Sequence, residues 1–154
     1  MLLKWFAPIL SFTTEEIFQI LNQGQSSSIH LQKFPKVPQM WENEKLFKKW
    51  EKFKIIRKVV NAAMEVKRAN KDIGSSLEAD VQVYLKGDYL KVAKGFDLPE
   101  NFITSKAEAK KMINEKNLFK LNDIEDIKVL VQKAKGKKCP RCWKIFPGPC
   151  MRCK

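Results

Sequence analysis

A spacing of three to four residues between hydrophobic positions predicts one long helix in the first half of the chain. The apolar positions of this stripe are Leu46, Trp50, Phe53, Ile56, Val60, Ala63 and Met64. They share one helical face, so the pattern favours a helix from about Glu44 to Lys71, with Gly74 suited to its exit. The other face is basic, because this segment holds ten Lys or Arg against three Glu.

A shorter helix is expected before the long one. Thr13 and Glu16 have the spacing of a capping box, in which each side chain bonds the backbone amide of the other residue. The apolar positions within residues 17–21 then share one face. Pro8 is expected to break or bend the preceding segment. The Ser- and Pro-containing stretch 24–41 is typical of connecting chain.

The pattern changes after the long helix. Apolar residues at 81, 83 and 85 alternate with Gln82 and Tyr84, as in a half-buried strand. Residues 102–104 are a candidate second strand, and residues 127–131 a third. Ser105 is expected to cap a helix that runs to about Asn114, with Glu108 as its capping-box partner. The expected fold class is therefore α+β, mainly α, with a small α/β lobe after the helices.

Charge is the unusual feature of the composition. The 154 residues carry a net charge of +13, and 44% of them are hydrophobic, which is enough for a core. A basic surface attracts polyanions such as nucleic acid, although a general enrichment in Lys is the alternative. No apolar run approaches the roughly 20 residues of a membrane span, so no membrane partner is expected.

The first residues of the chain indicate where in the cell the protein is expected to be located. Residues 1–10 are apolar but lack the charged start and cleavage site of a signal peptide. Such an opening is typical of the interior of a longer protein. Without an export signal, we expect a cytoplasmic and reducing location, which favours metal binding by cysteines over disulfides.

All four cysteines lie in the last sixteen residues, with the spacing Cys-x2-Cys-x7-Cys-x2-Cys. They are Cys139, Cys142, Cys150 and Cys153. Two such pairs supply the four thiolates of a tetrahedral Zn²⁺ site, and Pro147-Gly148-Pro149 can turn the chain between them. Four protein ligands leave no position for water, so one structural zinc is expected. Two disulfides, a redox pair and an iron–sulfur cluster are the alternatives.

The residues around the cysteines are basic. From Lys133 to Lys154 there are eight Lys or Arg and no Asp or Glu. Arg141 and Arg152 each precede the second cysteine of a pair and can bind phosphate, and Trp143 can stack on a base. As alternatives, Trp143 packs as a small core of the module and the arginines neutralise the thiolates.

The sequence offers no catalytic residues that we can identify. Its one histidine, His30, has no nucleophile nearby and is expected to be exposed or locally bonded. Neither a P-loop nor a G-x-G-x-x-G motif occurs.

Four stretches resemble the C-terminal part of bacterial-type isoleucyl-tRNA synthetases. They are LKWFAPILSFTTEEI at 3–17, SIHLQKFP at 28–35, VVNAAMEVKRANKDIGSSLEA at 59–79 and CPRCW at 139–143. The last two hold the most specific elements, IGSSLEA and CPRCW. The resemblance spans nearly the whole chain in the right order, although the seven-residue spacer between the cysteine pairs is short for the family's zinc module.

This resemblance implies a helical anticodon-binding bundle at 1–72, an α/β junction domain at 73–136 and a zinc finger at 137–154. It implies isoleucine-accepting tRNA and the catalytic part of the synthetase as partners. The family's His-x-Gly-His and Lys-Met-Ser-Lys-Ser motifs and its editing domain are absent, so ATP would bind only in the missing catalytic domain. The fragment alone is expected to be inactive.

The expected tRNA contacts come from the end of the long helix and from the cysteine module. They are Lys67, Arg68, Lys71, Arg141, Trp143, Lys144 and Arg152. One alternative is a free-standing zinc module that binds nucleic acid generally. Its basic tail also resembles that of formamidopyrimidine-type glycosylases, whose N-terminal Pro nucleophile and adjacent Glu are missing here. Another alternative is an inactive decayed gene product.

Overall fold

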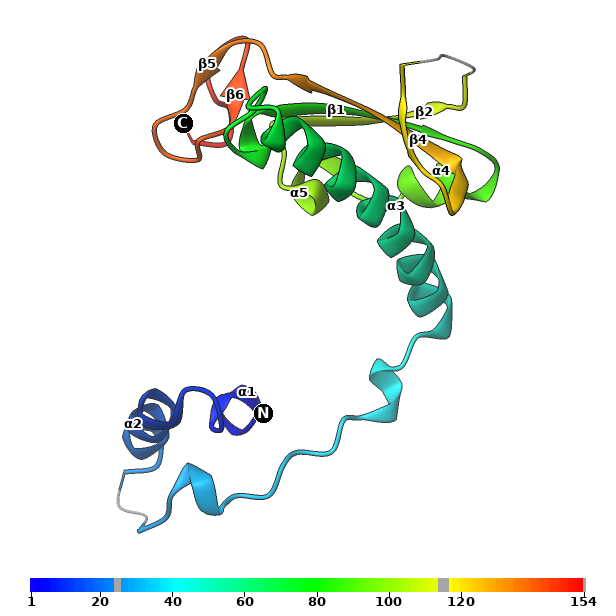
Figure 1. Ribbon diagram of the computed structural model, residues 1–154. Coiled ribbons are helices and arrows are strands. Elements are labelled where there is room, and N and C mark those ends of the chain that lie inside the picture. Colours follow the sequence, from blue (N-terminus) through cyan, green and yellow to red (C-terminus); the bar gives the residue numbers. More distant parts are fainter. Residues whose placement is uncertain (24–25, 114–116, 154) are drawn as a thin grey trace. The chain divides into compact units, whose positions relative to one another are not determined.

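The computed structural model describes residues 1–23, 26–113 and 117–153 (Figure 1). The chain forms two compact units, Met1–Asn43 and Glu44–Lys154. Among the described residues, no helix is both long enough and apolar enough to cross a membrane.

The first unit is helical. Its elements are α1 (Leu2–Phe6), α2 (Ser11–Leu21) and the 3-10 turns η1 (Ile29–Leu31) and η2 (Gln39–Trp41). Pro8 follows α1 closely, which agrees with its expected effect as a helix breaker. Much of the apolar surface here is exposed, including the side chains of Phe12 and Leu21.

The expected capping box at Thr13 and Glu16 is wrong. Helix α2 begins at Ser11, so its N-cap residue is Leu10, three positions earlier than expected, and Leu10 makes no side-chain cap. Thr14 is buried inside the helix, where its hydroxyl donates to the carbonyl of Leu10 at 2.8 Å. The helix therefore starts directly from the turn that follows α1, and its first amides do not need the Thr13 side chain.

Glu15 ties the segment after α2 back onto that helix. Its carboxylate accepts hydrogen bonds from the hydroxyl of Ser28 at 2.8 Å and the amide of Ile29 at 2.9 Å. The amide group of Gln19 donates to it at 2.6 Å. His30 is exposed and places Nε2 3.2 Å from a backbone carbonyl of α2, so the expectation of a locally bonded histidine is confirmed.

The second unit combines helices with a mixed sheet. Its helical elements are α3 (Glu44–Ala69), the 3-10 turn η3 (Ser76–Glu78), α4 (Asp88–Ala93) and α5 (Leu98–Phe102). Its main strands are β1 (Ala79–Leu85), β2 (Lys106–Lys111), β3 (Phe119–Leu121) and β4 (Ile124–Lys133). The sheet order is β2-β1-β4-β3, with β1 parallel to β2 and antiparallel to β4. A hairpin of β5 (Lys137–Lys138) and β6 (Ile145–Phe146) follows.

The long helix confirms the hydrophobic stripe, with two differences. Phe53 and Ile56 are fully buried, whereas Leu46 and Trp50, near the start of α3, stay partly exposed. The helix ends at Ala69, and the left-handed conformation after it is taken by Lys71 (φ 61°) ahead of Gly74.

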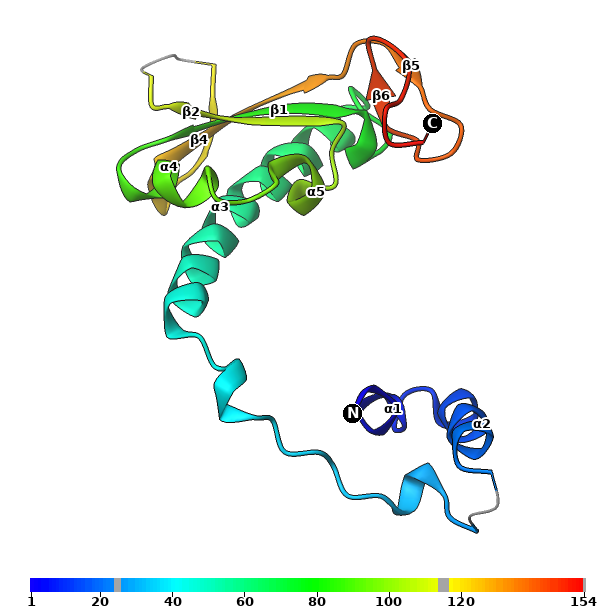
Figure 2. The same ribbon diagram turned by 180° about the vertical axis from the view of Figure 1, so that it is seen from behind.

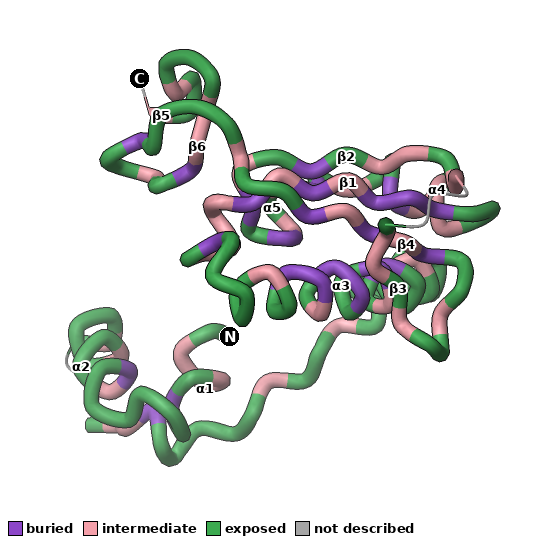
Figure 3. The backbone as a smooth tube through the Cα atoms, turned by 45° about the horizontal axis from the view of Figure 1, so that its top comes forward, coloured by how far each residue is buried: buried purple, intermediate pink, exposed green. Residues whose placement is uncertain are grey.

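Helices α3, α4 and α5 lie on one face of the sheet (Figures 1 and 2). Phe53 stacks on Phe96 and Phe102, with ring centroids 4.2 and 5.7 Å apart. Val81 and Val83 of β1 face this helical layer and are fully buried. Buried positions alternate along β1 from Ala79 to Val83 in Figure 3, as expected for a strand with one face in the core, and its last two residues are both buried.

Two expected elements after β1 are wrong. Residues 102–104 do not form a strand: α5 ends at Phe102, and Ile103 is its left-handed C-cap (φ 57°). The helix expected from Ser105 is strand β2, which pairs with β1 along the whole length of β1 from Asp80. Ala and Lys are strong helix formers, but intrinsic propensity is a weak guide to structure, and pairing with β1 overrides it here. The expected end of that helix, Asn114, lies outside the described residues.

The compact units are divided by packing at Asn43, and this division does not test the boundary at residue 72 that the resemblance implies. Helix α3 packs against β4 and β1 and shares their core, whereas the unit boundary falls at Asn43. The wide apolar stripe of α3 explains this arrangement, because the sheet buries it.

Candidate functional site

The four cysteines form a cluster in the module at the end of the chain. Their Sγ atoms all lie within 4.8 Å of one another, and those of Cys142 and Cys150 are 3.7 Å apart. Cys139 is buried and the other three are half-buried. All four are free cysteines, so the alternative of two disulfides is not seen in this structure. The cluster can hold a metal ion.

A tight turn presents the first cysteine pair. The amide of Trp143 donates to the carbonyl of Cys139 at 2.9 Å, and the amide of Cys139 donates to the carbonyl of Lys144 at 2.9 Å. Trp143 takes a left-handed conformation (φ 64°) at the exit of this turn. This turn connects β5 to β6, so the hairpin and the cysteine cluster share one frame.

The cysteine cluster has uneven proton affinities. Hydrogen bonds from the amides of Cys142 and Arg141 lower the pKa of Cys139 to about 6. Burial, followed by hydrogen bonds with neighbouring thiols, raises the pKa of Cys153 to about 12. The turn thus favours a thiolate at Cys139, and a bound cation would favour thiolates at the remaining positions.

Two of the basic residues around the cysteines are engaged with an acidic partner. Lys144 is buried, and its Nζ lies 2.5 Å from Oε1 of Glu100. Nη1 of Arg152 lies 2.8 Å from the same oxygen. These three residues line a shallow pocket of about 490 Å³ together with Arg141. The hydrogen bond from Lys144 is the main cause that lowers the pKa of Glu100.

Trp143 and Arg141, by contrast with the buried Lys144, have exposed side chains. Trp143 is 59% exposed, so the alternative in which it forms the core of the module is wrong. Nζ of Lys138 sits 5.6 Å from the centre of the Trp143 ring. Arg141 is also exposed. Both side chains are therefore accessible to a ligand.

The end of α3 carries the remaining expected contacts. Lys67 pairs with Asp72 at 2.9 Å, and Arg68 pairs with Glu65 at 2.7 Å. Lys71 is exposed and forms no ion pair with any residue that the structure describes. These pairs are exposed, so they contribute little and exchange readily for another anion.

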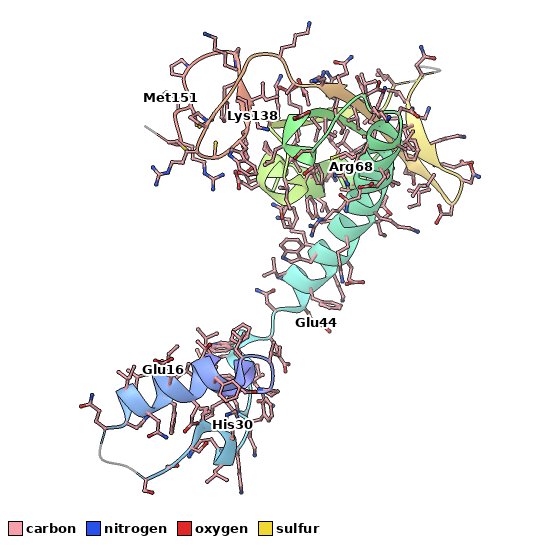
Figure 4. All side chains as sticks on the ribbon, turned by 60° about the vertical axis from the view of Figure 1, so that its left-hand side comes forward. Glu16, His30, Glu44, Arg68, Lys138 and Met151 are labelled. Atoms are coloured by element: carbon pink, nitrogen blue, oxygen red, sulfur yellow. The ribbon has the colours of Figure 1, made fainter. Side chains whose placement is uncertain are left out.

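The end of α3 and the cysteine module lie at the same end of the second unit (Figures 1 and 2). The two regions are connected through η3. The backbone carbonyl of Glu78 accepts a hydrogen bond from the amide of Ala134 at 2.7 Å, and the carboxylate of Glu78 lies 3.9 Å from Nζ of Lys138. Figure 4 labels Arg68 on α3 and Lys138 and Met151 on the module. The structure therefore brings both sets of expected contacts to one basic end.

Sequence reasoning missed Glu100 and Ser105 as parts of this region. The hydroxyl of Ser105 donates to the carbonyl of Leu77 and accepts the amide of Ile145, both at 2.5 Å. Asp97 and Glu100 have the spacing of a capping box, which predicts the start of α5. That signal locates Glu100 on a helix but does not indicate its partners.

Residues 1–84 match the family model described as the anticodon-binding domain of tRNA ligase. The chain belongs to this family. Similar curated relatives of this anticodon-binding chain are isoleucine–tRNA ligases. That of Pelagibacter ubique is 45% identical over 98% of the chain, that of Bradyrhizobium diazoefficiens 41% over 94%, and that of Natranaerobius thermophilus 37% over 95%. The chain spans only 14–16% of the length of these relatives.

The expected resemblance to isoleucyl-tRNA synthetases is thus confirmed, and it covers the cysteine module as well as the anticodon-binding family match. A free-standing nucleic-acid module is not favoured, because the similarity to ligases extends along nearly the whole chain.

Proposed function

We propose that this chain is the tRNA-binding, C-terminal part of an isoleucine–tRNA ligase. The parent enzyme joins isoleucine to its tRNA with ATP, and the catalytic and editing parts lie elsewhere in it. The match of residues 1–84 to the anticodon-binding family carries this proposal. The basic character of the chain, +13 overall, supports a polyanionic partner.

The proposal assigns a separate role to each of three parts of the chain. Residues 1–72 act as the anticodon-binding domain, residues 73–136 as a junction domain and residues 137–154 as a zinc finger. The mixed sheet of the junction carries the finger at one end and the last turn of α3 beside it, which supports a joint RNA surface.

The cysteine cluster fits Zn²⁺. Four thiolates at about 2.3 Å from a tetrahedral zinc stand about 3.8 Å from one another. The 3.7 Å between the Sγ atoms of Cys142 and Cys150 supports this geometry, as do the amides directed at Cys139. With Cys139, Cys142, Cys150 and Cys153 as ligands, the metal is structural and holds the turn that presents Arg141 and Trp143.

We assign RNA contact first to the accessible groups. Arg141 and Lys71 are exposed cations, and Trp143 offers a ring for base stacking. Lys67 and Arg68 can exchange their exposed intramolecular partners for phosphate. Contact by Arg152 or Lys144 requires breaking their ion pairs with Glu100, and Lys144 is also buried.

The test is binding of the zinc-loaded chain to fluorescent isoleucine tRNA, followed by anisotropy, with random duplex DNA as competitor. We expect the tRNA to bind more tightly than the DNA, and binding to weaken as salt rises. Each lost phosphate contact should reduce the slope of log K against log salt by about 0.7–0.9. Equal affinity for tRNA and random DNA would refute the proposed function.

A pair of variants localises the surface. Arg141→Gln should weaken tRNA binding and reduce the salt slope. Lys91→Gln removes the same charge from α4, which lies at the opposite end of the second unit in Figures 1 and 2. Lys91 is 85% exposed, and we expect a smaller effect there. A larger loss at Lys91 than at Arg141 would contradict the assigned surface.

A further inference from the structure

Among the described residues, a few polar contacts attach the cysteine module (residues 137–153) to the rest of the second unit. The most concentrated of them is at Glu100 of α5, where one carboxylate oxygen receives both Lys144 at 2.5 Å and Arg152 at 2.8 Å. Charge-assisted bonds of this kind are stronger and more directional than neutral ones. Lys144 is 7% exposed, whereas the side chains of Glu100 and Arg152 are 49% and 59% exposed, so the contact is shielded from solvent only at Lys144.

The two cations come from different halves of the module. Lys144 follows the first cysteine pair, and Arg152 lies inside the second pair, next to Cys153. They meet on one oxygen because the cysteine cluster brings the two halves together. Glu100 therefore contacts the assembled module, whereas either half alone offers it a single cation.

A second contact fixes the same face. Ser105 joins the carbonyl of Leu77 to the amide of Ile145, which follows Lys144 directly. The carbonyl of Lys144 is itself bonded by the amide of Cys139. The backbone at Lys144 and Ile145 is thus hydrogen-bonded both to Cys139 of the cysteine cluster and to Ser105, which directly precedes strand β2.

We propose that Glu100 is a positioning residue, which docks the assembled cysteine module on the junction domain and so sets the orientation of Arg141 and Trp143 toward tRNA. This inference rests on the proposed function, because it assigns a role in that same RNA surface. Glu100 itself touches no RNA. It acts through Lys144 and Arg152, which serve as docking cations and not as phosphate contacts.

The direction in which Glu100→Gln changes tRNA affinity distinguishes a positioning role from a purely electrostatic one. Glu100→Gln raises the net charge by one unit and releases two cations. If Lys144 and Arg152 acted mainly on phosphates, the variant would bind tRNA more tightly. If Glu100 positions the module, the variant binds more weakly despite its higher positive charge.

The experiment compares the zinc-loaded full chain with Glu100→Gln and with Asp123→Asn. The control removes the same charge from an exposed ion pair with Lys58, at 3.2 Å on the β3–β4 side. We expect Glu100→Gln to lower tRNA affinity about 5- to 10-fold, in the lower range of coupling between distinct sites. Asp123→Asn should leave affinity unchanged or slightly raised. Tighter or unchanged binding by Glu100→Gln would overturn the proposal.

A readout without tRNA keeps the proposal testable on its own. Backbone ¹⁵N relaxation should give residues 137–153 the same correlation time as β1 and β4 in the parent chain, and faster internal motion in Glu100→Gln. Zinc content and far-UV circular dichroism should match the parent. If the variant module stays as rigid as the parent module, Glu100 does not dock it, whatever the RNA result. If the parent chain fails to bind tRNA while Glu100→Gln frees the module, the proposed function fails and the docking role stands.

Discussion

Replacement of one proposed metal ligand tests how the cysteine module is stabilised. Cys150→Ser removes the sulfur that lies 3.7 Å from Cys142. Of the described residues from 137 onward, only Cys139 and Lys144 are buried. With so little apolar burial, the module cannot offset the conformational entropy of folding without its metal. We expect the variant to lose order throughout residues 137–153.

The size of the effect follows from the ligand count. Zinc binds structural sites with about 10–16 kcal/mol at neutral pH, so an equal share for each of four thiolates is about 2.5–4 kcal/mol. Loss of one share corresponds to about 10²- to 10³-fold weaker zinc binding. The core cluster of the second unit draws its buried residues from α3, the sheet and the segments between them, and from no residue of the module. The rest of the unit should therefore keep its stability.

Zinc affinity is measured by competition with a chelator, and the extent of disorder by amide signals along the chain. Met151→Ser is the matched control, because it places serine on the neighbouring position, which is 73% exposed and not a ligand. It should bind zinc like the parent. Loss of helicity throughout the chain in Cys150→Ser would refute a module that folds separately, and unchanged zinc affinity would refute the ligand set.

Three further predictions concern the scaffold. Phe53→Ala removes a fully buried ring stacked on Phe96 and should lower the unfolding free energy, measured by urea titration, by about 3–5 kcal/mol. A loss under about 1 kcal/mol would contradict this packing. Gly136→Ala should disrupt the β5–β6 hairpin, because at φ 133° an added Cβ would lie 2.0 Å from the carbonyl oxygen of Phe146. The amide signals of the hairpin in NMR spectra should then be lost, and an intact hairpin would refute this prediction. Hydrogen bonds from Gln19 and then Ser28 lower the pKa of Glu15, so its stabilising contacts are complete above its usual pKa of 4.5 and are lost as pH falls through the lower folded value. The amide shift of Ile29 should titrate with a midpoint below 4.5, and a midpoint at or above 4.5 would refute that link.

The long helix and the strands β1 and β4 were predictable because burial imposes a period on the sequence. Phe53, Ile56 and Val60 repeat at helical spacing, and Val81 and Val83 alternate, so pattern and environment agree. The cysteine cluster was predictable for a different reason: two Cys-x-x-Cys turns at this spacing have the pattern of a four-thiolate metal site, and the structure brings the four sulfurs together.

Strand β2 was not predictable from its own residues. Ala107 and Ala109 sit among Lys and Glu, which favour a helix when considered locally. Their small side chains face the helices on the buried side of the sheet, and their strand conformation is imposed by pairing with Val81 and Val83. Tertiary pairing between residues far apart in sequence leaves no local signal.

The basic residues of the module show the same limit at the site. Lys144 and Arg141 have similar surroundings in sequence, yet one is buried against Glu100 and the other is exposed. Their difference depends on where α5 lies, and that position follows from the packing of Phe102 on Phe53. Charge in the sequence therefore predicts a basic end but does not separate docking cations from ligand-binding ones.

Trp143 gives a last prediction, which separates stability from binding. A bulky residue in the left-handed conformation is strained by about 1–3 kcal/mol. The ring is 59% exposed, and its contact with Lys138 at 5.6 Å contributes only about 0.5–1 kcal/mol at such a site. The fold of the module therefore gains little from tryptophan at this position, where glycine would adopt φ 64° without strain.

If Trp143 is present for RNA, Trp143→Gly should leave zinc affinity and module stability unchanged or slightly raised, while tRNA affinity falls by about 1–3 kcal/mol, the usual value of one base–aromatic stack. Trp143→Phe keeps a ring and the backbone strain, so it should recover part of the binding and none of the stability. Chelator competition and tRNA anisotropy on the same three proteins measure the two effects. A module that Trp143→Gly destabilises, with tRNA binding lost only in proportion to folding, would show that the ring serves the fold and would remove Trp143 from the RNA surface.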